Sequence, residues 1–255
     1  GNLTGFPNRI RWSALENPID WPVIGSADAA NKYSDQQDFV DGNPGEVRGI
    51  IGGVANADCV ILLERAMVRG TFTADSFIFR FDLMEGARGT PAPGSVVQVG
   101  ALFYYLGEDG FYVCDGATSS PISNHKISDW FFTNADKLYF SNISATADPG
   151  LPIIWWAFAG PGNTLGAPNM LLGYNWTTRR WFVVEPGTVE YLFIGGTFGY
   201  TVDSAGAATG YGVDDSPFGP DSAFWSGGKQ FLSGFNSAHK LVYFSGTNLA
   251  AEFET

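Results

Sequence analysis

The two histidines and two cysteines are the first residues to weigh for catalysis. A serine or cysteine nucleophile needs a nearby base, which is most often histidine. His125 and His239 both lie in polar stretches that are typical of turns, and no G-x-S-x-G sequence is present. Cys59 and Cys114 each lie inside an apolar run, where a thiol packs as a small hydrophobic group. We therefore expect no catalytic residue of this kind and two buried free thiols.

Three carboxylates recur in one polar stretch and are the candidates for a metal site. Asp35, Asp38 and Asp41 stand at every third residue, whereas a calcium loop spaces its first ligands at every second residue. The chain also has no H-E-x-x-H, C-x-x-C or G-x-x-x-x-G-K-[ST] sequence. The pattern favours a solvated acidic loop, and we expect no metal and no cofactor.

Paired carboxylates are the strongest catalytic alternative, because glycoside hydrolysis uses two of them. Glu108-Asp109 and Asp214-Asp215 are such pairs. Each pair lies beside turn residues, where aspartate is common for backbone reasons. We assign no catalytic residue and expect the chain not to be an enzyme.

Tryptophan could also build a sugar-binding face, because its ring stacks on apolar sugar surfaces. Most of the tryptophans lie inside strand-like runs, which favours packing between sheets. The eight are Trp12, Trp21, Trp130, Trp155, Trp156, Trp176, Trp181 and Trp225. A carbohydrate-binding or glycan-cleaving protein remains the alternative function.

Charge and hydropathy exclude two further classes. The net charge is -12, and the acidic residues are scattered, so the basic surface that nucleic-acid binding requires is missing. An acidic surface would let DNA pass without binding, because like charges repel. No stretch approaches the ~20 apolar residues of a membrane helix, so we expect no membrane segment.

The composition indicates the elements that must position these residues. The 33 glycines, 14 prolines and 15% aromatic residues favour many short strands separated by turns. Four apolar runs recur at intervals of about 40–50 residues, or twice that, which is the period of β-propeller blades. They are Cys59–Arg65, Ala101–Gly107, Pro152–Phe158 and Lys240–Gly246. The sequence therefore predicts an all-β fold, a β-propeller of four-stranded antiparallel blades that is complete or partial.

Further strands are expected on either side of these runs. Continuous apolar runs are typical of strands covered on both faces. The flanking strands are predicted at Val47–Val54, Met67–Phe72, Phe77–Phe81, Ser95–Val99, Phe111–Cys114, Met170–Tyr174 and Trp181–Val184. One propeller-like domain over residues 1–255 is expected, an excerpt of a longer chain, with loops or blade insertions at 26–41 and 204–220.

Four segments carry a resemblance to a known family. They are Pro7–Trp21, Leu62–Arg69, Phe103–Tyr112 and Leu171–Trp181. In this order they resemble the β-propeller structural proteins of tailed bacteriophages, which form the tail nozzle or hub, or the head–tail connector, below the portal. The resemblance touches most of the chain, and its motifs are turns and strands.

This resemblance implies a function in assembly. A protein of this kind forms a homo-oligomeric ring in the virion, is assembled in the bacterial host cytoplasm, and contacts portal or adaptor subunits and tail fibres. Double-stranded DNA passes through its channel without specific binding. No catalytic residue comes with the resemblance.

Overall fold

Antiparallel sheets dominate the structure, a computed structural model that describes residues 3, 5–73, 78–86, 88–185, 189–196 and 230–244. Within these residues there are three four-stranded sheets, one three-stranded sheet and one two-stranded ribbon. The all-β prediction is confirmed. In the three larger sheets each strand pairs with its neighbour in sequence, so each is an antiparallel meander.

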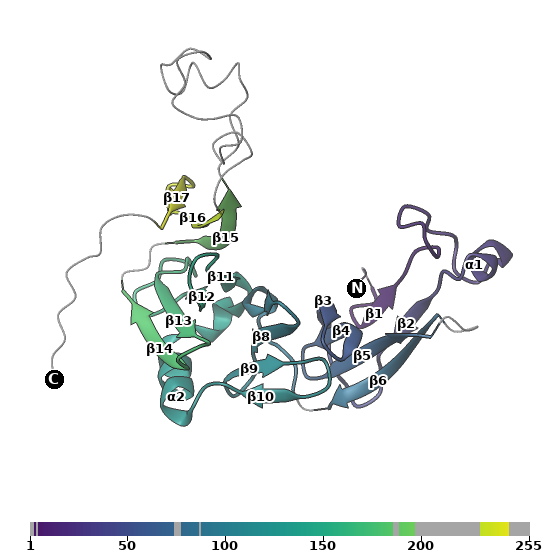
Figure 1. Cartoon of the computed structure of the whole chain (residues 1–255), viewed down its shortest axis with the longest axis horizontal. Coiled ribbons are helices and arrows are strands. Elements are labelled where there is room, and N and C mark those ends of the chain that lie inside the picture. The colour runs from purple at the N-terminus through teal and green to yellow at the C-terminus, as the bar shows by residue number, and fades with distance from the viewer. Residues whose placement is uncertain are drawn as a thin grey trace, which may run out of the picture.

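The sheets follow one another along the chain (Figure 1). The first sheet holds β3 (Val47–Val54), β4 (Ala57–Leu63), β5 (Met67–Phe72) and β6 (Phe79–Glu85). The second holds β7 (Val97–Val99), β8 (Leu102–Leu106), β9 (Phe111–Cys114) and β10 (Ser119–Pro121). The third holds β11 (Ser144–Ala147), β12 (Ile153–Phe158), β13 (Met170–Asn175) and β14 (Arg180–Val184). The fourth holds β15 (Tyr191–Gly196), β16 (Gln230–Phe235) and β17 (Leu241–Tyr243).

The second strand of each larger sheet is buried on both faces. Successive side chains of a strand point to opposite faces, so a continuous apolar run needs a partner on each side. In β4, Val60 and Leu62 pack toward the second sheet, while Ile61 and Leu63 pack in the opposite direction. In β8 and β12 the same alternation fills the spaces on both sides of the second and third sheets. The apolar runs thus require the sheets to stack face to face.

Hydrogen bonds also join neighbouring sheets. The Ala55 amide donates to the Ala101 carbonyl over 3.0 Å, between the first and second sheets. The Trp156 indole donates to the Ser95 carbonyl over 2.9 Å, and the Leu192 amide donates to the Ser144 hydroxyl over 3.0 Å. The first strands touch as well, since β7 contacts β11, and β11 contacts β15.

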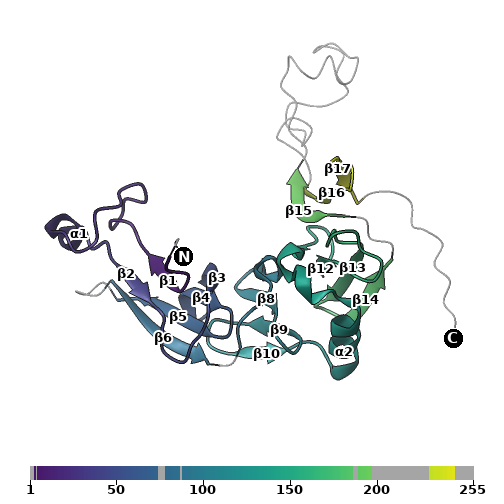
Figure 2. The same cartoon turned by 180° about the vertical axis from the view of Figure 1, so that it is seen from behind.

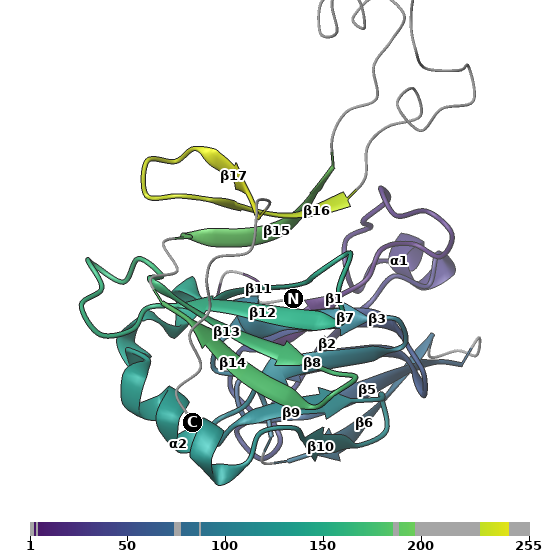
Figure 3. The same ribbon diagram turned by 60° about the vertical axis from the view of Figure 1, so that its left-hand side comes forward.

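The sheets form an arc rather than a straight stack. In Figure 1, β3 and β11, the first strands of the first and third sheets, lie nearer the middle of the view than β6 and β14, the last strands of those sheets, and Figure 2 shows the same arc from behind. The view in Figure 3 places the fourth sheet over the third. The first and third sheets therefore have their first strands on the inner side of the arc and their last strands on its outer side.

A two-stranded ribbon covers part of the first sheet. β1 (Arg9–Arg11) pairs with β2 (Gln36–Asp38), and Ile10 and Phe39 pack on the face of the first sheet that turns away from the second. Segment 26–41, expected as a loop or insertion, contains β2 and the short helix α1 (Ala27–Asn31), whose N-terminus the Ser26 hydroxyl caps. β2 has a polar sequence and forms a strand because it pairs with β1, so part of the predicted loop is a strand.

The predicted turn around His125 is wrong. His125 begins the helix α2 (His125–Asn134), and the Asn124 side chain caps it by accepting from the Ile127 amide at 3.1 Å. Phe131 of this helix is fully buried between the second and third sheets. Short 3-10 turns precede β7 and β11, at Pro93–Ser95 (η1) and Lys137–Asn142 (η2).

Most predicted strands are found, with three differences. The fourth apolar run, Lys240–Gly246, contains β17, the third strand of its sheet, whereas each of the other three runs contains the second strand of its sheet. β6 spans Phe79–Glu85 and so continues beyond the predicted Phe77–Phe81, and β7 begins at Val97, after η1. Segment 204–220 lies outside the described residues.

Among the described helices, none is both long and apolar enough to cross a membrane.

Substitution of Trp156 tests whether the sheets stack face to face, because its indole is fully buried between the second and third sheets. Trp156→Ala removes this ring and leaves a cavity, so we expect a loss of about 3–5 kcal/mol in the free energy of unfolding. Urea unfolding followed by circular dichroism measures it. Ile19→Ala, at a side chain that is 88% exposed, is the control and should change stability by no more than about 0.5 kcal/mol. Equal effects of the two substitutions would contradict the stacking.

Candidate binding groove

The histidines and predicted carboxylate pairs are dispersed over the fold. His125 begins α2, whereas His239 lies in the turn before β17 with a positive φ of 55°, and its Nδ1 lies 3.2 Å from Glu190 Oε2. Asp109 accepts a hydrogen bond of 2.7 Å from the Tyr112 hydroxyl, at the turn before β9. The Asp214-Asp215 pair lies outside the described residues. The structure therefore brings none of the described candidates together as an acid–base pair.

The three aspartates proposed as metal candidates also point to separate partners. Asp38 forms a bidentate ion pair with Arg9, whose Nη2 lies 2.7 Å from Asp38 Oδ2. Asp35 accepts a hydrogen bond of 2.8 Å from the Gln36 amide, and Asp41 is exposed. In the part of the chain that is described, no group of three or more histidine, cysteine or acidic residues could hold a metal ion.

Both cysteines are free thiols, as the sequence predicts. Cys114 is buried between the first and second sheets, and Cys59 is partly buried against the ribbon. Burial raises the pKa of the Cys114 thiol to about 11 and also raises the pKa of Cys59. A raised pKa keeps a thiol protonated and weakly nucleophilic at neutral pH.

Most of the tryptophans pack between sheets rather than forming a sugar-binding face. Trp130, Trp156, Trp176 and Trp181 line the space between the second and third sheets, and Trp155 lies on the opposite face of β12. Trp21 is half exposed, and Trp225 lies outside the described residues.

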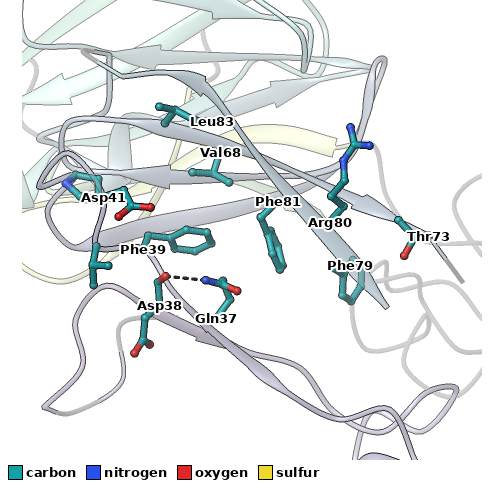
Figure 4. Close-up of a pocket in the computed structure, with 12 residues that line it drawn as sticks. Gln37, Asp38, Phe39, Asp41, Val68, Thr73, Phe79, Arg80, Phe81 and Leu83 are labelled. Carbon is teal, nitrogen blue, oxygen red and sulfur yellow. Dashed lines mark hydrogen bonds between the residues drawn. The ribbon is translucent and has the colours of Figure 1, made fainter. Parts of the chain in front are cut away.

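An aromatic groove with a volume of about 580 Å³ opens between the ribbon and the outer strand of the first sheet (Figure 4). Its aromatic surface consists of Phe39, which follows β2, and of Phe79 and Phe81 on β6. The rings of Phe39 and Phe81 meet edge to face at 5.6 Å, and those of Phe79 and Phe81 lie 6.1 Å apart. Leu83 and Val40 extend the apolar surface and are 64% and 66% exposed. The groove can receive apolar side chains.

Strand register places the aromatic rings on one face. Val68, Gly70 and Phe72 of β5 pair with Leu83, Phe81 and Phe79 of β6, so all six lie on the face toward the ribbon. Gly70 leaves room there for the Phe81 ring, because a Cβ at this position would lie 3.3 Å from the ring and 2.5 Å from Cys59 Sγ. A glycine in this strand therefore permits the close packing behind the groove.

Polar side chains surround the apolar surface. The Gln37 side-chain amide donates a hydrogen bond of 2.8 Å to the Asp38 carbonyl (Figure 4). Arg80 forms an ion pair with Asp82, with Arg80 Nη2 2.7 Å from Asp82 Oδ2. Arg9 holds the pKa of Asp38 below its usual value. Asp41 has no ion pair among the described residues. The rim thus offers one unpaired negative charge.

A second polar cluster joins the first and second sheets at their outer edge. Glu85 at the end of β6 accepts hydrogen bonds from the amide and hydroxyl of Ser119 on β10, at 2.8 and 2.7 Å. Arg88 lies 3.1 Å from the other Glu85 oxygen, donates to the Ser119 carbonyl, and lies over the Tyr112 ring. Each of these polar groups has a partner, so the cluster holds the outer edges of the two sheets together. We call Glu85, Arg88 and Ser119 the latch.

Neither the groove nor this latch was predicted from the sequence. Both depend on residues that are far apart along the chain, and neither has a motif. The pairing of Phe77–Phe81 with Met67–Phe72 was the available signal for the groove, because it implied aromatic residues on one face of the sheet.

No protein-family model matches the chain, and no curated protein is significantly similar to it.

The latch predicts that Glu85 contributes to stability. Glu85→Ala leaves the Ser119 amide and the Arg88 guanidinium without their carboxylate, which costs about 1–3 kcal/mol in the free energy of unfolding. Chemical denaturation measures the loss. Glu64→Ala removes a carboxylate from the more exposed Glu64–Arg65 ion pair, for which we expect about 0–1 kcal/mol. The interpretation is wrong if the two variants lose the same stability.

Two buried tyrosines predict a loss of stability at alkaline pH. Burial raises the pKa of Tyr105, and burial together with Asp109 raises the pKa of Tyr112 to about 12. Below pH ~10 both phenols are neutral in the folded and unfolded chain, whereas above it the unfolded chain ionises first. Stability should therefore fall between about pH 10 and 12. Denaturation at several pH values measures this, and Tyr112→Phe should flatten the decline; an unchanged slope would contradict it.

Proposed function

We propose that the chain is part of a β-propeller and acts as a structural component of a tailed-bacteriophage virion, in the tail nozzle or hub or in the head–tail connector. One observation supports the architecture above all others. Three four-stranded antiparallel meanders follow one another along the chain and pack face to face in an arc, and the first strands of the second and third sheets touch. Propeller blades have this form and this arrangement.

Assembly is the function that this geometry favours. The described catalytic candidates lie on different elements, and the charged groups with good geometry, such as Glu85 and Arg88, hold sheets together. The virion context comes from the resemblance of the turn and strand segments to phage propeller proteins. In that context the protein joins portal or adaptor subunits and tail fibres.

The acidic charge is compatible with a DNA passage. A net charge of -12 repels phosphates, so a duplex could move through a channel without being held. The proposal assigns no residue to such a channel.

Immunogold electron microscopy tests the proposal. Antibodies raised against the purified chain are applied to intact phage particles from the source culture, and the same particles are analysed by mass spectrometry. We expect gold at one vertex or along the tail, together with peptides of this chain in the particles. Particles from the same culture that carry neither label nor peptides would contradict the virion role.

A glycan array tests the alternative function. The aromatic residues of the groove are phenylalanines, which have no hydrogen-bonding group for sugar hydroxyls. We therefore expect no saturable binding of any glycan. Binding that Phe81→Ala abolishes while the fold is retained would favour a carbohydrate-binding protein over a structural one.

A further inference from the structure

We propose that two copies of this chain pair through the groove on the first sheet, with an apolar arm of each copy lying in the groove of the other. The arm consists of residues 13–34, which connect the two strands of the ribbon. The inference goes beyond the proposed function, because it names the surfaces through which copies meet and depends on neither a propeller nor a virion.

The arm exposes its large apolar side chains and buries only small residues. The buried residues are Ala14, Pro22, Ala29 and Ser34. The exposed large apolar side chains are Leu15, Ile19, Trp21, Val23 and Tyr33, at 44%, 88%, 50%, 77% and 47%. Large apolar side chains are normally among the most buried groups of a folded chain. Because the arm has the reverse distribution, these side chains are available to a partner.

Hydrogen bonds and an ion pair hold the arm in one conformation. The Ala14 amide donates to the Asp20 carbonyl over 2.9 Å, and the Leu15 amide donates to the Lys32 carbonyl over 2.9 Å. Lys32 Nζ also lies 2.9 Å from Asp20 Oδ2, so the two sides of the arm are joined. A loop that is already fixed loses little conformational entropy on binding, which favours affinity.

The arm of a copy does not fill its own groove. It begins directly after Trp12, whose ring contacts the groove rings of Phe79 and Phe81 at 5.5 and 5.9 Å. From there the arm extends past the ribbon, as the position of α1 in Figures 1 and 2 shows, and Ile19 and Val23 remain exposed. The arm and the groove are therefore neighbours on one copy, and both are open.

Neighbouring arm and groove suit a two-fold contact between copies. In a two-fold dimer the same surface of both copies meets, so each contact forms twice. A two-fold axis beside the ribbon places the arm of each copy against the groove of the other. Specific interfaces bury about 800 Å² per partner, whereas a single apolar patch on a monomer covers about 300–600 Å². The arm and the groove together therefore reach an area that either surface alone does not.

The arm carries an excess of negative charge. Asp20 and Asp28 share its single basic side chain, Lys32, whose Nζ lies 2.9 and 3.1 Å from the two carboxylates. Glu16 is exposed and has no ion pair among the residues that the structure describes. The arm therefore favours a partner surface with positive charge.

The β6 side of the groove carries the opposite excess. Arg69 and Arg80 share one carboxylate, at distances of 3.6 and 2.7 Å from Asp82 Oδ2. Arg80 lines the groove, and its side chain is 66% exposed. Asp41, on the ribbon side, is negative. The arm is thus attracted to β6 and repelled from Asp41, which favours one docking orientation over others.

Native mass spectrometry and analytical ultracentrifugation of the chain test this directly. We expect a dimer with twice the 27.5 kDa mass of one chain. Val23→Asp in the arm and Leu83→Asp in the groove each place a charge in the contact at an exposed position, so each should weaken dimerisation more than about tenfold. Leu138→Asp is the matched control, because Leu138 is 85% exposed on η2, which packs against β12 and η1, and it should leave the dimer unchanged.

Mixing the two variants tests whether the arm of one copy lies in the groove of the other. A dimer of the Val23→Asp chain with the Leu83→Asp chain retains one unmodified contact, between the intact groove of the first and the intact arm of the second. We expect this mixed dimer to form at concentrations where each variant alone is monomeric. Circular dichroism confirms that each variant is folded. At about 0.1 µM, where a micromolar dimer dissociates, the unfolding comparison with Ile19→Ala reports on single copies.

Four results would overturn the inference. They are a wild-type chain that stays monomeric at about 100 µM, where a micromolar contact is saturated, an assembly that grows beyond two copies, a dimer that neither substitution weakens, and variants that do not recover on mixing. None of these results bears on whether the chain is present in phage particles, so the proposed function is tested separately.

Discussion

The strand that lies second in each larger sheet carries apolar side chains on both faces, and this constraint governs the rest of the structure. A strand such as β12 can bury Trp156 on one side and Ala157 on the other only between two further layers. Each sheet therefore needs the next, and the chain becomes a succession of meanders. The same constraint leaves apolar surface at the groove, where the ribbon covers only part of the first sheet.

Polar groups contribute mainly by fixing how the sheets meet. The Trp156 indole bonded to the Ser95 carbonyl, and Glu85 bonded to Ser119, both connect neighbouring sheets. Burial strengthens such bonds and makes an unpaired polar group costly, so they favour one arrangement of the sheets over a sliding stack. The raised pKa values of Tyr112 and Cys114 follow from the same closeness of the first two sheets.

The sequence predicted the strands better than their partners. Val47–Val54, Met67–Phe72 and Phe111–Cys114 are strands with the predicted bounds, because apolar runs between glycine-rich turns leave few alternatives. α2 was missed because its capping residue, Asn124, is also a common turn residue. β2 is polar and becomes a strand only by pairing with the distant β1. The groove likewise depends on contact between the rings of Phe39, which follows β2, and Phe81 on β6. Such long-range contacts have no local signal.

A double-mutant cycle across one sheet interface tests the face-to-face stacking most directly. The rings of Phe111 on β9 and Trp156 on β12 lie 4.8 Å apart between the second and third sheets, whereas Trp155 lies on the opposite face of β12. Unfolding free energies of the single and double variants should give a coupling of about 0.5–1.5 kcal/mol for Phe111→Leu with Trp156→Phe. Phe111→Leu with Trp155→Phe should give a coupling close to zero. Equal coupling for both pairs, or none for either, would contradict the stacking of successive sheets.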